Sequence, residues 1–194
     1  MAEAVALDPG AYGGTYKLVG GAPALDFANL VSYRGTSREH DWLLPPSNLA
    51  AWVAAVGLEV DLEAVDDVAG LREVLARVFL AVADATTPAA ADVARIGALA
   101  GSAGAGRRLV FEPGEPAARW AGPVRSLPVA LARDAAELLT SAQTLRRVTA
   151  CDECRWVFLD TTRNHSRRWC DPADCGNRSR QRRHYQRRRT ALPT

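Results

Sequence analysis

The spacing of apolar residues predicts that the first 145 residues fold mainly into helices. Between Asp61 and Ala85, apolar side chains recur at intervals of three and four residues, which places them on one helical face: Leu71, Val74, Leu75, Val78 and Val82. Gly70 is expected to divide this segment into two helices. The same periodicity, with start and stop signals at its ends, predicts further helices over residues 23–31, 47–56, 88–101 and 127–144.

Few segments of this part have the character of β-strands. Residues 16–19 predict one short strand, and residues 35–46 are expected to form a loop. Residues 108–111 and 117–121 flank a turn rich in proline and glycine, so they predict one small hairpin. The predicted fold class is therefore mainly α, with α+β character confined to that hairpin, in a domain spanning residues 1–145.

A second, small domain is predicted over residues 146–194, because the composition changes there. Eleven arginines against five acids give residues 151–194 a net charge of +6, so the overall charge of +2 leaves −4 for the first 150 residues. Such a split indicates a polyanion-binding end and a separate role for the rest. The segment has few large apolar side chains, and a unit of this size is seldom stable through burial alone.

The four cysteines of the chain all lie in this second segment and predict a metal site. Their spacing is C-x2-C, a gap of 15 residues, then C-x4-C, formed by Cys151, Cys154, Cys170 and Cys175. Two such pairs complete a tetrahedral thiolate cage for one Zn²⁺ ion, and four protein ligands leave no open position for catalysis. The ion is therefore expected to be structural, and to supply folding free energy that the thin local core lacks.

The alternative is four cysteines that are simply buried or joined in disulfides. The first ten residues lack the pattern of a secretory signal, and no apolar run approaches the roughly 18 residues of a membrane helix. We therefore expect a cytoplasmic protein with no membrane partner, and thiols stay reduced in that compartment, which favours the metal. His165 and His184 are expected to be exposed or to contact phosphate rather than to replace a thiol.

The residues around the second cysteine pair predict how the metal segment is built. A hairpin is expected over residues 155–160, and Asp171-Pro172 or Asp174 is expected to cap a helix that carries Cys175 in its first turn. A hairpin knuckle followed by a helix that holds the second pair would be a treble-clef-like zinc finger.

An arginine-rich segment follows the last cysteine and predicts a helix that binds nucleic acid. Residues 176–189 read GNRSRQRRHYQRRR, with seven arginines and no acid. On a helix one stripe would hold Arg178, Arg182, Tyr185 and Arg189, and the remaining surface would carry Arg180, Arg183, Arg187 and Arg188. No apolar face is left, so the helix must be solvated or must meet a partner of opposite charge. Guanidinium groups suit phosphate and guanine edges, which indicates a nucleic acid as the partner; the choice of double-stranded DNA over RNA rests on the family resemblance described below.

Two further arginines, Arg167 and Arg168 beside Cys170, are expected to make auxiliary phosphate contacts. The alternative for the whole arginine-rich segment is a solvated basic tail. Asn177 and Arg178 belong either to the fold of the finger or to the nucleic-acid contact, and the sequence leaves both roles open.

A narrow polar stripe is expected on the helix over residues 23–31 and its extension. Asp26, Asn29 and Tyr33 stand at i, i+3 and i+7 among apolar neighbours. Such a stripe either lines a ligand pocket or ties down a neighbouring loop by hydrogen bonds. His40 and Asp41 are adjacent in a loop, but no triad, carboxylate pair or phosphate loop assembles around them, so we do not expect an enzyme.

Several of these motifs together resemble a known family. Cys151-x2-Cys154-Arg-Trp-Val-Phe-Leu-Asp160, Arg167-Arg-Trp-Cys170 and Cys175-Gly-Asn-Arg178 are similar to the CGNR zinc finger, which is named after the last tetrad. Upstream, the runs at residues 24–29, 41–43, 49–52 and 71–74 resemble the ABATE domain that accompanies this finger. The resemblance covers nearly the whole chain, and it implies a bacterial, stress-linked transcriptional regulator that binds DNA.

The sequence thus predicts a two-part regulator. Its first part would sense a small-molecule effector or form a homodimer, and its zinc finger would present the arginine-rich helix to DNA. One rival is a protein-interaction module in which the finger docks an acidic partner. The other is a small-molecule-binding protein or enzyme with a pocket near Asp26 and Asn29.

Overall fold

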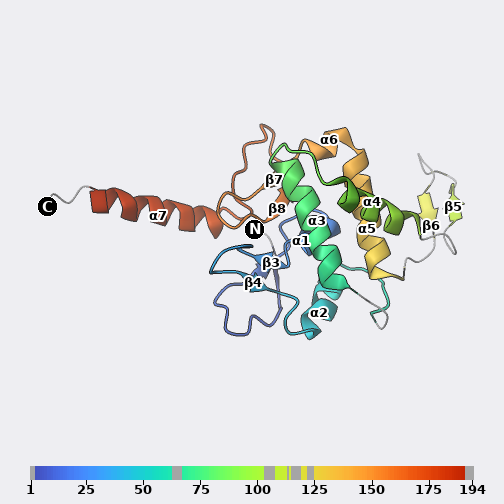
Figure 1. Cartoon of the computed structure of the whole chain (residues 1–194), viewed down its shortest axis with the longest axis horizontal. Helices are drawn as coiled ribbons and strands as arrows, with labels where there is room; N and C mark the ends of the chain where they lie inside the picture. The colour runs from blue at the N-terminus through green and yellow to red at the C-terminus, as the bar shows by residue number, and fades with distance from the viewer. Residues whose placement is uncertain are drawn as a thin grey trace.

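Four helices form the body of the molecule in the computed structural model, which describes residues 3–62, 67–102, 108–112, 114, 119–121 and 125–190. They are α1 (Pro23–Ala28), α3 (Val68–Ala83), α4 (Ala90–Gly101) and α5 (Leu127–Thr140). Helix α4 lies along α5, and α1 packs against both α3 and α5 (Figure 1). The mainly helical fold expected from the sequence is therefore confirmed.

Helix α3 buries the face that its periodicity predicts. Leu71, Val74, Leu75 and Val78 are all buried there, and Phe79 joins them. The helix starts at Val68, later than expected, and Gly70 does not divide it. Gly70 lies in the first turn, where its N–H donates to the Asp67 carboxylate at 3.0 Å. A Cβ atom on Gly70 would lie 2.1 Å from that carboxylate, so glycine here makes room for the N-terminal cap.

Helix α1 is shorter than predicted, which breaks up the expected polar stripe. It ends at Ala28, Asn29 is its C-cap, and Tyr33 follows with φ at 53°. Between them the chain turns into strand β3 (Val31–Ser32), which pairs with β4 (His40–Asp41) inside the segment expected to be a loop. Asp26, Asn29 and Tyr33 therefore do not share one helical face, and the prediction that they do was wrong.

The segment predicted as one helix over residues 127–144 forms two helices. Ser141 adopts an extended conformation between α5 and the short helix α6 (Ala142–Leu145), and its hydroxyl accepts the Thr144 N–H at 3.2 Å. Helix α2 (Ser47–Ala55) lies beside strand β1 (Ala4–Val5). Strand β1 pairs with β2 (Tyr16–Lys17), at the start of the strand expected over residues 16–19.

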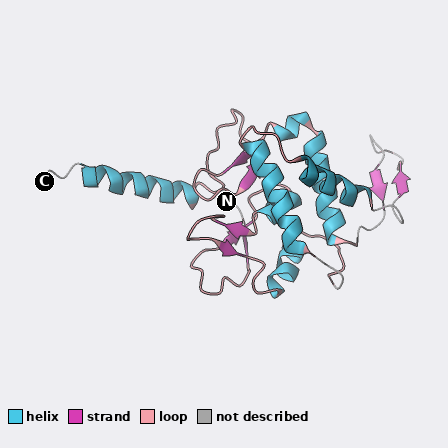
Figure 2. Cartoon of the chain, in the orientation of Figure 1, coloured by secondary structure: helices cyan, strands magenta, loops and turns pink. Residues whose placement is uncertain are grey.

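The predicted hairpin is present, as β5 (Arg108–Val110) paired with β6 (Arg119–Ala121). Residues 117 and 118 of the expected second strand lie outside the described residues. Figure 2 shows how small these strand pairs are beside the helices. Within the part of the chain that the structure describes, no helix has both the length and the apolar character needed to cross a membrane.

The buried core is continuous across the boundary that the sequence suggests near residue 145. Strands β7 (Val148–Ala150) and β8 (Val157–Leu159) pair with each other and pack on α1 and α3. Trp156 and Phe158 are buried in the same cluster as Phe27 of α1 and Leu75 of α3. By contrast, helix α7 (Cys175–Thr190) extends away from the body (Figure 1). The division into domains at residues 145 and 146 remains a prediction.

Candidate metal centre

The first cysteine pair lies on the tight turn that joins β7 to β8. Cys151 follows β7, and its N–H donates to the Trp156 carbonyl at 2.8 Å. The Arg155 N–H donates back to the Cys151 carbonyl at 2.9 Å, with Arg155 in the left-handed region at φ 64°. This turn points the two sulfurs of Cys151 and Cys154 to the same side. The hairpin therefore brackets the first pair, rather than following it over residues 155–160 as expected.

The second pair is positioned by a loop that Asp160 organises. This buried carboxylate accepts N–H groups from Thr162 at 2.8 Å and from Arg167 at 2.9 Å. Burial opposes its ionisation, but these hydrogen bonds still hold the pKa of Asp160 below its ordinary value. The loop ends at Cys170, and Cys175 is the first residue of α7, as predicted. A knuckle followed by a helix with a ligand in its first turn is the treble-clef-like arrangement expected.

The four sulfurs converge on one point. All four cysteines are buried, and their Sγ atoms lie within 4.8 Å of one another, with Cys170 3.5 Å from both Cys154 and Cys175. Zn²⁺ holds thiolates at about 2.3 Å, so the sulfurs of a tetrahedral site lie about 3.8 Å apart. The geometry fits one structural Zn²⁺ ion held by Cys151, Cys154, Cys170 and Cys175.

The electrostatics of the cluster also favour a cation. Hydrogen bonding to the Cys151 sulfur, reinforced by burial and by repulsion between neighbouring thiolates, raises the pKa of Cys154 and Cys170 well above the ordinary value. Four thiolates cannot coexist at this spacing without a positive ion among them. A divalent cation removes that conflict, and metal binding is then coupled to the release of protons.

The C-G-N-R tetrad acts within the finger itself. Asn177 donates to the Ala173 carbonyl at 2.6 Å and accepts from Arg180, which fastens the first turn of α7. Arg178 donates to the Cys175 sulfur at 3.3 Å, and its guanidinium lies 5.9 Å from the centre of the Tyr33 ring. Both side chains thus contact the chain's own atoms in this structure, and a contact of either with nucleic acid stays a prediction.

The arginines expected to meet nucleic acid differ in how they are engaged. Arg167 donates to the carbonyls of Trp169 and Cys170 and stacks on Phe158 at 4.3 Å, so it supports the metal loop. Arg168 pairs with Asp152, and Arg182 pairs with Glu153.

Farther along α7, residues 181–187 are all exposed, including Arg183, Tyr185 and Arg187. For Arg188 and Arg189, the structure describes only the helical backbone. Residues 181–187 of α7 therefore present their side chains to solvent.

Two of the three polar residues considered for a ligand pocket, Asp26 and Asn29, are hydrogen-bonded to backbone, whereas the buried Tyr33 hydroxyl has no partner among the described residues. Asp26 accepts the N–H groups of Val19 and Gly20 at 2.9 and 2.7 Å. Asn29 is bonded to the backbone of Val157, and Tyr33 is buried, which raises its pKa to about 12. Asp26 and Asn29 thus tie down neighbouring backbone in this structure, and the ligand-binding role stays a prediction.

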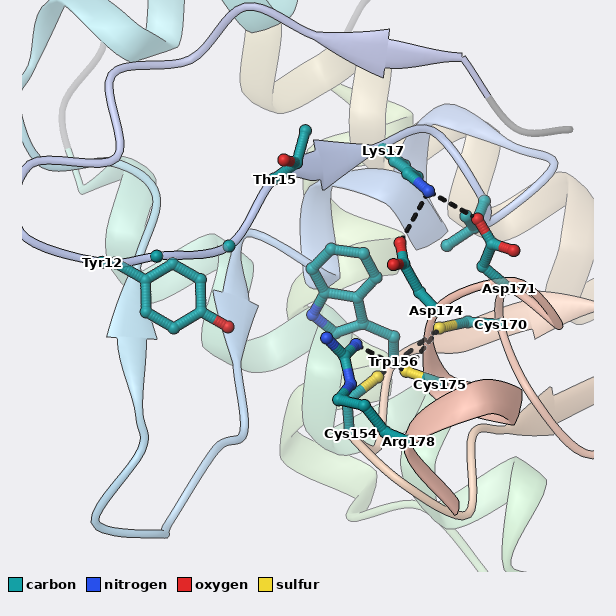
Figure 3. A pocket seen from close by; sticks show the side chains of 13 residues that line it. Tyr12, Thr15, Lys17, Cys154, Trp156, Cys170, Asp171, Asp174, Cys175 and Arg178 are labelled. Atoms are coloured by element: carbon teal, nitrogen blue, oxygen red, sulfur yellow. Dashed lines mark hydrogen bonds and ion pairs between the residues drawn. The ribbon is translucent and has the colours of Figure 1, made fainter. Parts of the chain in front are cut away.

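The contacts of Lys17, which is the only lysine of the chain, were not predicted from the sequence. Its ammonium lies 2.7 Å from Asp171 and 2.6 Å from Asp174, and both acids belong to the segment that leads into α7 (Figure 3). Hydrogen bonding to Asp171 and then to Asp174 raises the pKa of Lys17. The N-terminal strand β2 thereby holds the root of α7. The presence of a single lysine could have drawn attention to Lys17, but it could not identify partners that lie about 154 residues away in the sequence.

Comparison with protein families agrees with this geometry. The model of the ABATE family, described as "Putative stress-induced transcription regulator", matches residues 21–142. The chain belongs to the ABATE family. The model of the CGNR zinc finger matches residues 147–188, which contain all four cysteines. Both resemblances seen in the sequence are thus confirmed, and neither family is a family of enzymes. No curated protein matches the chain.

Proposed function

We propose that this ABATE-family protein is a cytoplasmic transcriptional regulator that binds double-stranded DNA through α7. The observation that supports it best is the helix itself, which has no apolar face and no acidic residue, and which extends from the body into solvent. A helix of 16 residues is about 24 Å long, and the major groove of DNA accepts a helix of this width.

The zinc centre supports this proposal because it makes the helix rigid at its base. Cys175 is both the first residue of α7 and a zinc ligand, and Lys17 pairs with Asp171 and Asp174 just before it. A helix rooted in this way loses little conformational entropy on binding, unlike a free basic tail. The remaining ABATE-type part would act as a sensor domain or a dimerisation domain.

The contact is proposed to use the exposed residues Arg183, Tyr185 and Arg187, together with Arg188 and Arg189. Arg168, Arg180 and Arg182 would join after exchanging their internal partners for phosphate. Arg167 and Arg178 would act mainly by holding the metal loop and the helix root, since their guanidinium groups already contact Cys170 and Cys175.

The test is fluorescence anisotropy of the full-length, zinc-loaded chain with a labelled duplex over a range of salt concentrations. If four or five arginines meet phosphates, the logarithm of the affinity should fall against the logarithm of the salt concentration with a slope of about −4. Arg183→Gln should weaken binding and flatten the slope by about one. The matched control is Arg125→Gln, an exposed arginine in front of α5, which should leave binding unchanged.

A slope near zero would overturn the proposal. Binding to a labelled polyglutamate peptide without binding to duplex DNA would favour the rival, a module that docks an acidic protein.

A further inference from the structure

A cavity of about 130 Å³ lies beside the metal centre, where the N-terminal segment meets the finger (Figure 3). Its polar and aromatic lining comes from two regions of the sequence: Tyr12, Thr15 and Lys17 on one side, and Trp156, Asp174 and Arg178 on the other. Three of the four cysteines of the metal centre, Cys154, Cys170 and Cys175, also line it. It does not include Asp26, Asn29 or Tyr33, so it is distinct from the pocket that the sequence suggested.

The Tyr12 side of the cavity is well fixed. The Tyr12 ring stacks on His40 with a centroid distance of 4.3 Å and meets the edge of Trp42 at 5.4 Å. A Cβ atom on Gly14 would lie 2.2 Å from the Tyr12 ring, so glycine at this position lets the ring lie against the backbone. Opposite it, Trp156 is anchored by its indole N–H, which donates to the Val31 carbonyl at 3.0 Å. Two held aromatic rings thus frame the cavity.

Hydrogen-bond donors in the cavity wall are left without acceptors. The Nε–H group of Arg178 is buried and has no partner among the described residues, although Nη2 of the same guanidinium contacts Cys175. The hydroxyls of Tyr12, which is half-buried, and of Thr15, which is exposed, make no hydrogen bond within the part of the chain that the structure describes. Nη1 of Arg178 also has no partner among the described residues and, unlike Nε, is not buried, so this wall offers a charged donor to an oxygen-bearing group of a ligand.

The charge around the cavity excludes a strongly anionic ligand. Lys17 and Arg178 balance Asp171 and Asp174, but a Zn²⁺ ion with four thiolates carries a net charge of −2. A phosphate or sulfate dianion would therefore be repelled. Asp174 pairs with Lys17 through one oxygen, and its side chain keeps 42% of its surface exposed. A carboxylate thus remains accessible close to the unpaired guanidinium N–H.

We propose that this cavity binds a small zwitterion of the α-amino-acid class. The ligand's carboxylate would accept from Arg178 Nη1–H and from the hydroxyls of Tyr12 and Thr15, and its ammonium would donate to Asp174. Asp174 and Arg178 lie one helical turn apart, because the backbone N–H of Arg178 donates to the Asp174 backbone carbonyl at 2.9 Å. A neutral zwitterion satisfies both groups and adds no net charge to negative surroundings.

The experiment is isothermal titration calorimetry of the full-length, zinc-loaded chain with a panel of common L-amino acids. Each amino acid that binds is compared with its amide, which lacks the carboxylate, and with its N-acetyl form, which lacks the ammonium. The zwitterion should bind with saturation, and both derivatives should bind at least about tenfold more weakly, since each loses a charge-assisted hydrogen bond. Because this measurement involves no DNA, its result does not depend on whether the chain binds DNA as proposed above.

Two variants locate the site. Asp174→Asn should weaken binding about tenfold or more, and Tyr12→Phe, which keeps the ring and removes the hydroxyl, by about threefold. Zinc content and melting temperature check that each variant is folded. The control Asp61→Asn removes an exposed carboxylate that lies 3.5 Å from Arg125 and should change nothing. The proposal is overturned if no amino acid binds the wild type, or if binding survives both variants unchanged.

Discussion

Asn29 and Val157 exchange two hydrogen bonds although 128 residues separate them. The Asn29 side-chain amide donates to the Val157 carbonyl, and the Val157 N–H donates to the Asn29 amide oxygen, each at 2.8 Å. Asn29 thus pairs with strand β8 as a neighbouring strand would. This contact joins the end of α1 to the hairpin that carries the first two zinc ligands.

Replacing Asn29 with alanine should therefore destabilise the whole chain. The change leaves the buried N–H and carbonyl of Val157 without partners, which costs about 2–4 kcal/mol in the free energy of unfolding. Urea unfolding in excess zinc measures the loss. Gln143→Ala, at an exposed position of α6, is the matched control and should stay within about 0.5 kcal/mol of wild type. An equal effect of the two variants would contradict the role given to Asn29.

Removing zinc should lower the melting temperature of the helical body as well as that of the finger. Trp156 and Phe158 lie in one buried cluster with Phe27 and Leu75, so loosening the hairpin exposes part of the shared core. A loss of about 3 kcal/mol or more corresponds to roughly 10 °C for a chain of this size. Circular dichroism at 222 nm, with and without a chelator, follows the helices.

Adding zinc back after chelation is the control for that measurement and should restore the original curve. A helical transition that chelation leaves in place, with a separate early transition for the finger, would show instead that the finger unfolds independently.

Neutralising Glu153 should strengthen the proposed binding to DNA. The Glu153 side chain is 3% exposed and pairs with Arg182, so this acid engages an arginine of α7 in the free protein. Glu153→Gln weakens that pair and leaves Arg182 available to phosphate. The affinity should rise several-fold, and the salt slope should steepen by about one.

Anisotropy titrations at two salt concentrations measure this change. Asp92→Asn provides the matched control, because it removes the same charge and releases Arg77, which lies on α3 away from α7. If Asp92→Asn strengthens binding as much as Glu153→Gln, the effect comes from net charge and not from Arg182.

Asp26 should make the stability of the protein depend on pH. Burial, with a smaller contribution from the nearby Asp134, raises the pKa of Asp26 to about 6. The folded state therefore holds this proton more tightly than the unfolded state, whose Asp26 titrates near the ordinary value of about 3.9. The resulting stability is fully present below about pH 4 and is lost as the pH rises through about 6.

Asp26→Asn keeps an oxygen that can accept from Val19 and Gly20 but does not ionise in this range. Between about pH 4 and pH 7, the free energy of unfolding of wild type should fall relative to that of the variant by up to roughly 3 kcal/mol. Urea unfolding of both proteins at matched pH values measures the difference, and zinc release at low pH affects both alike. A difference that stays constant across this range would contradict the assignment.

The sequence by itself determined the features that depend on local spacing and residue type. The four cysteines, the apolar face of α3 and the arginine-rich helix after Cys175 were all predicted correctly, as was the mainly helical fold. Each follows from a physical constraint within one segment: thiolate chemistry, a period of 3.6 residues, or a helix without an apolar face.

Only the tertiary structure decided what depends on partners far away in the chain. Asn29 is hydrogen-bonded to strand β8, α1 stops at Ala28 instead of Val31, and Lys17 holds the root of α7. The cavity beside the zinc site exists because the fold brings Tyr12 and Trp156, from distant parts of the chain, into one lining. A local pattern carries no record of such pairings, because a buried polar group is satisfied by whichever backbone or side chain the folded chain brings to it.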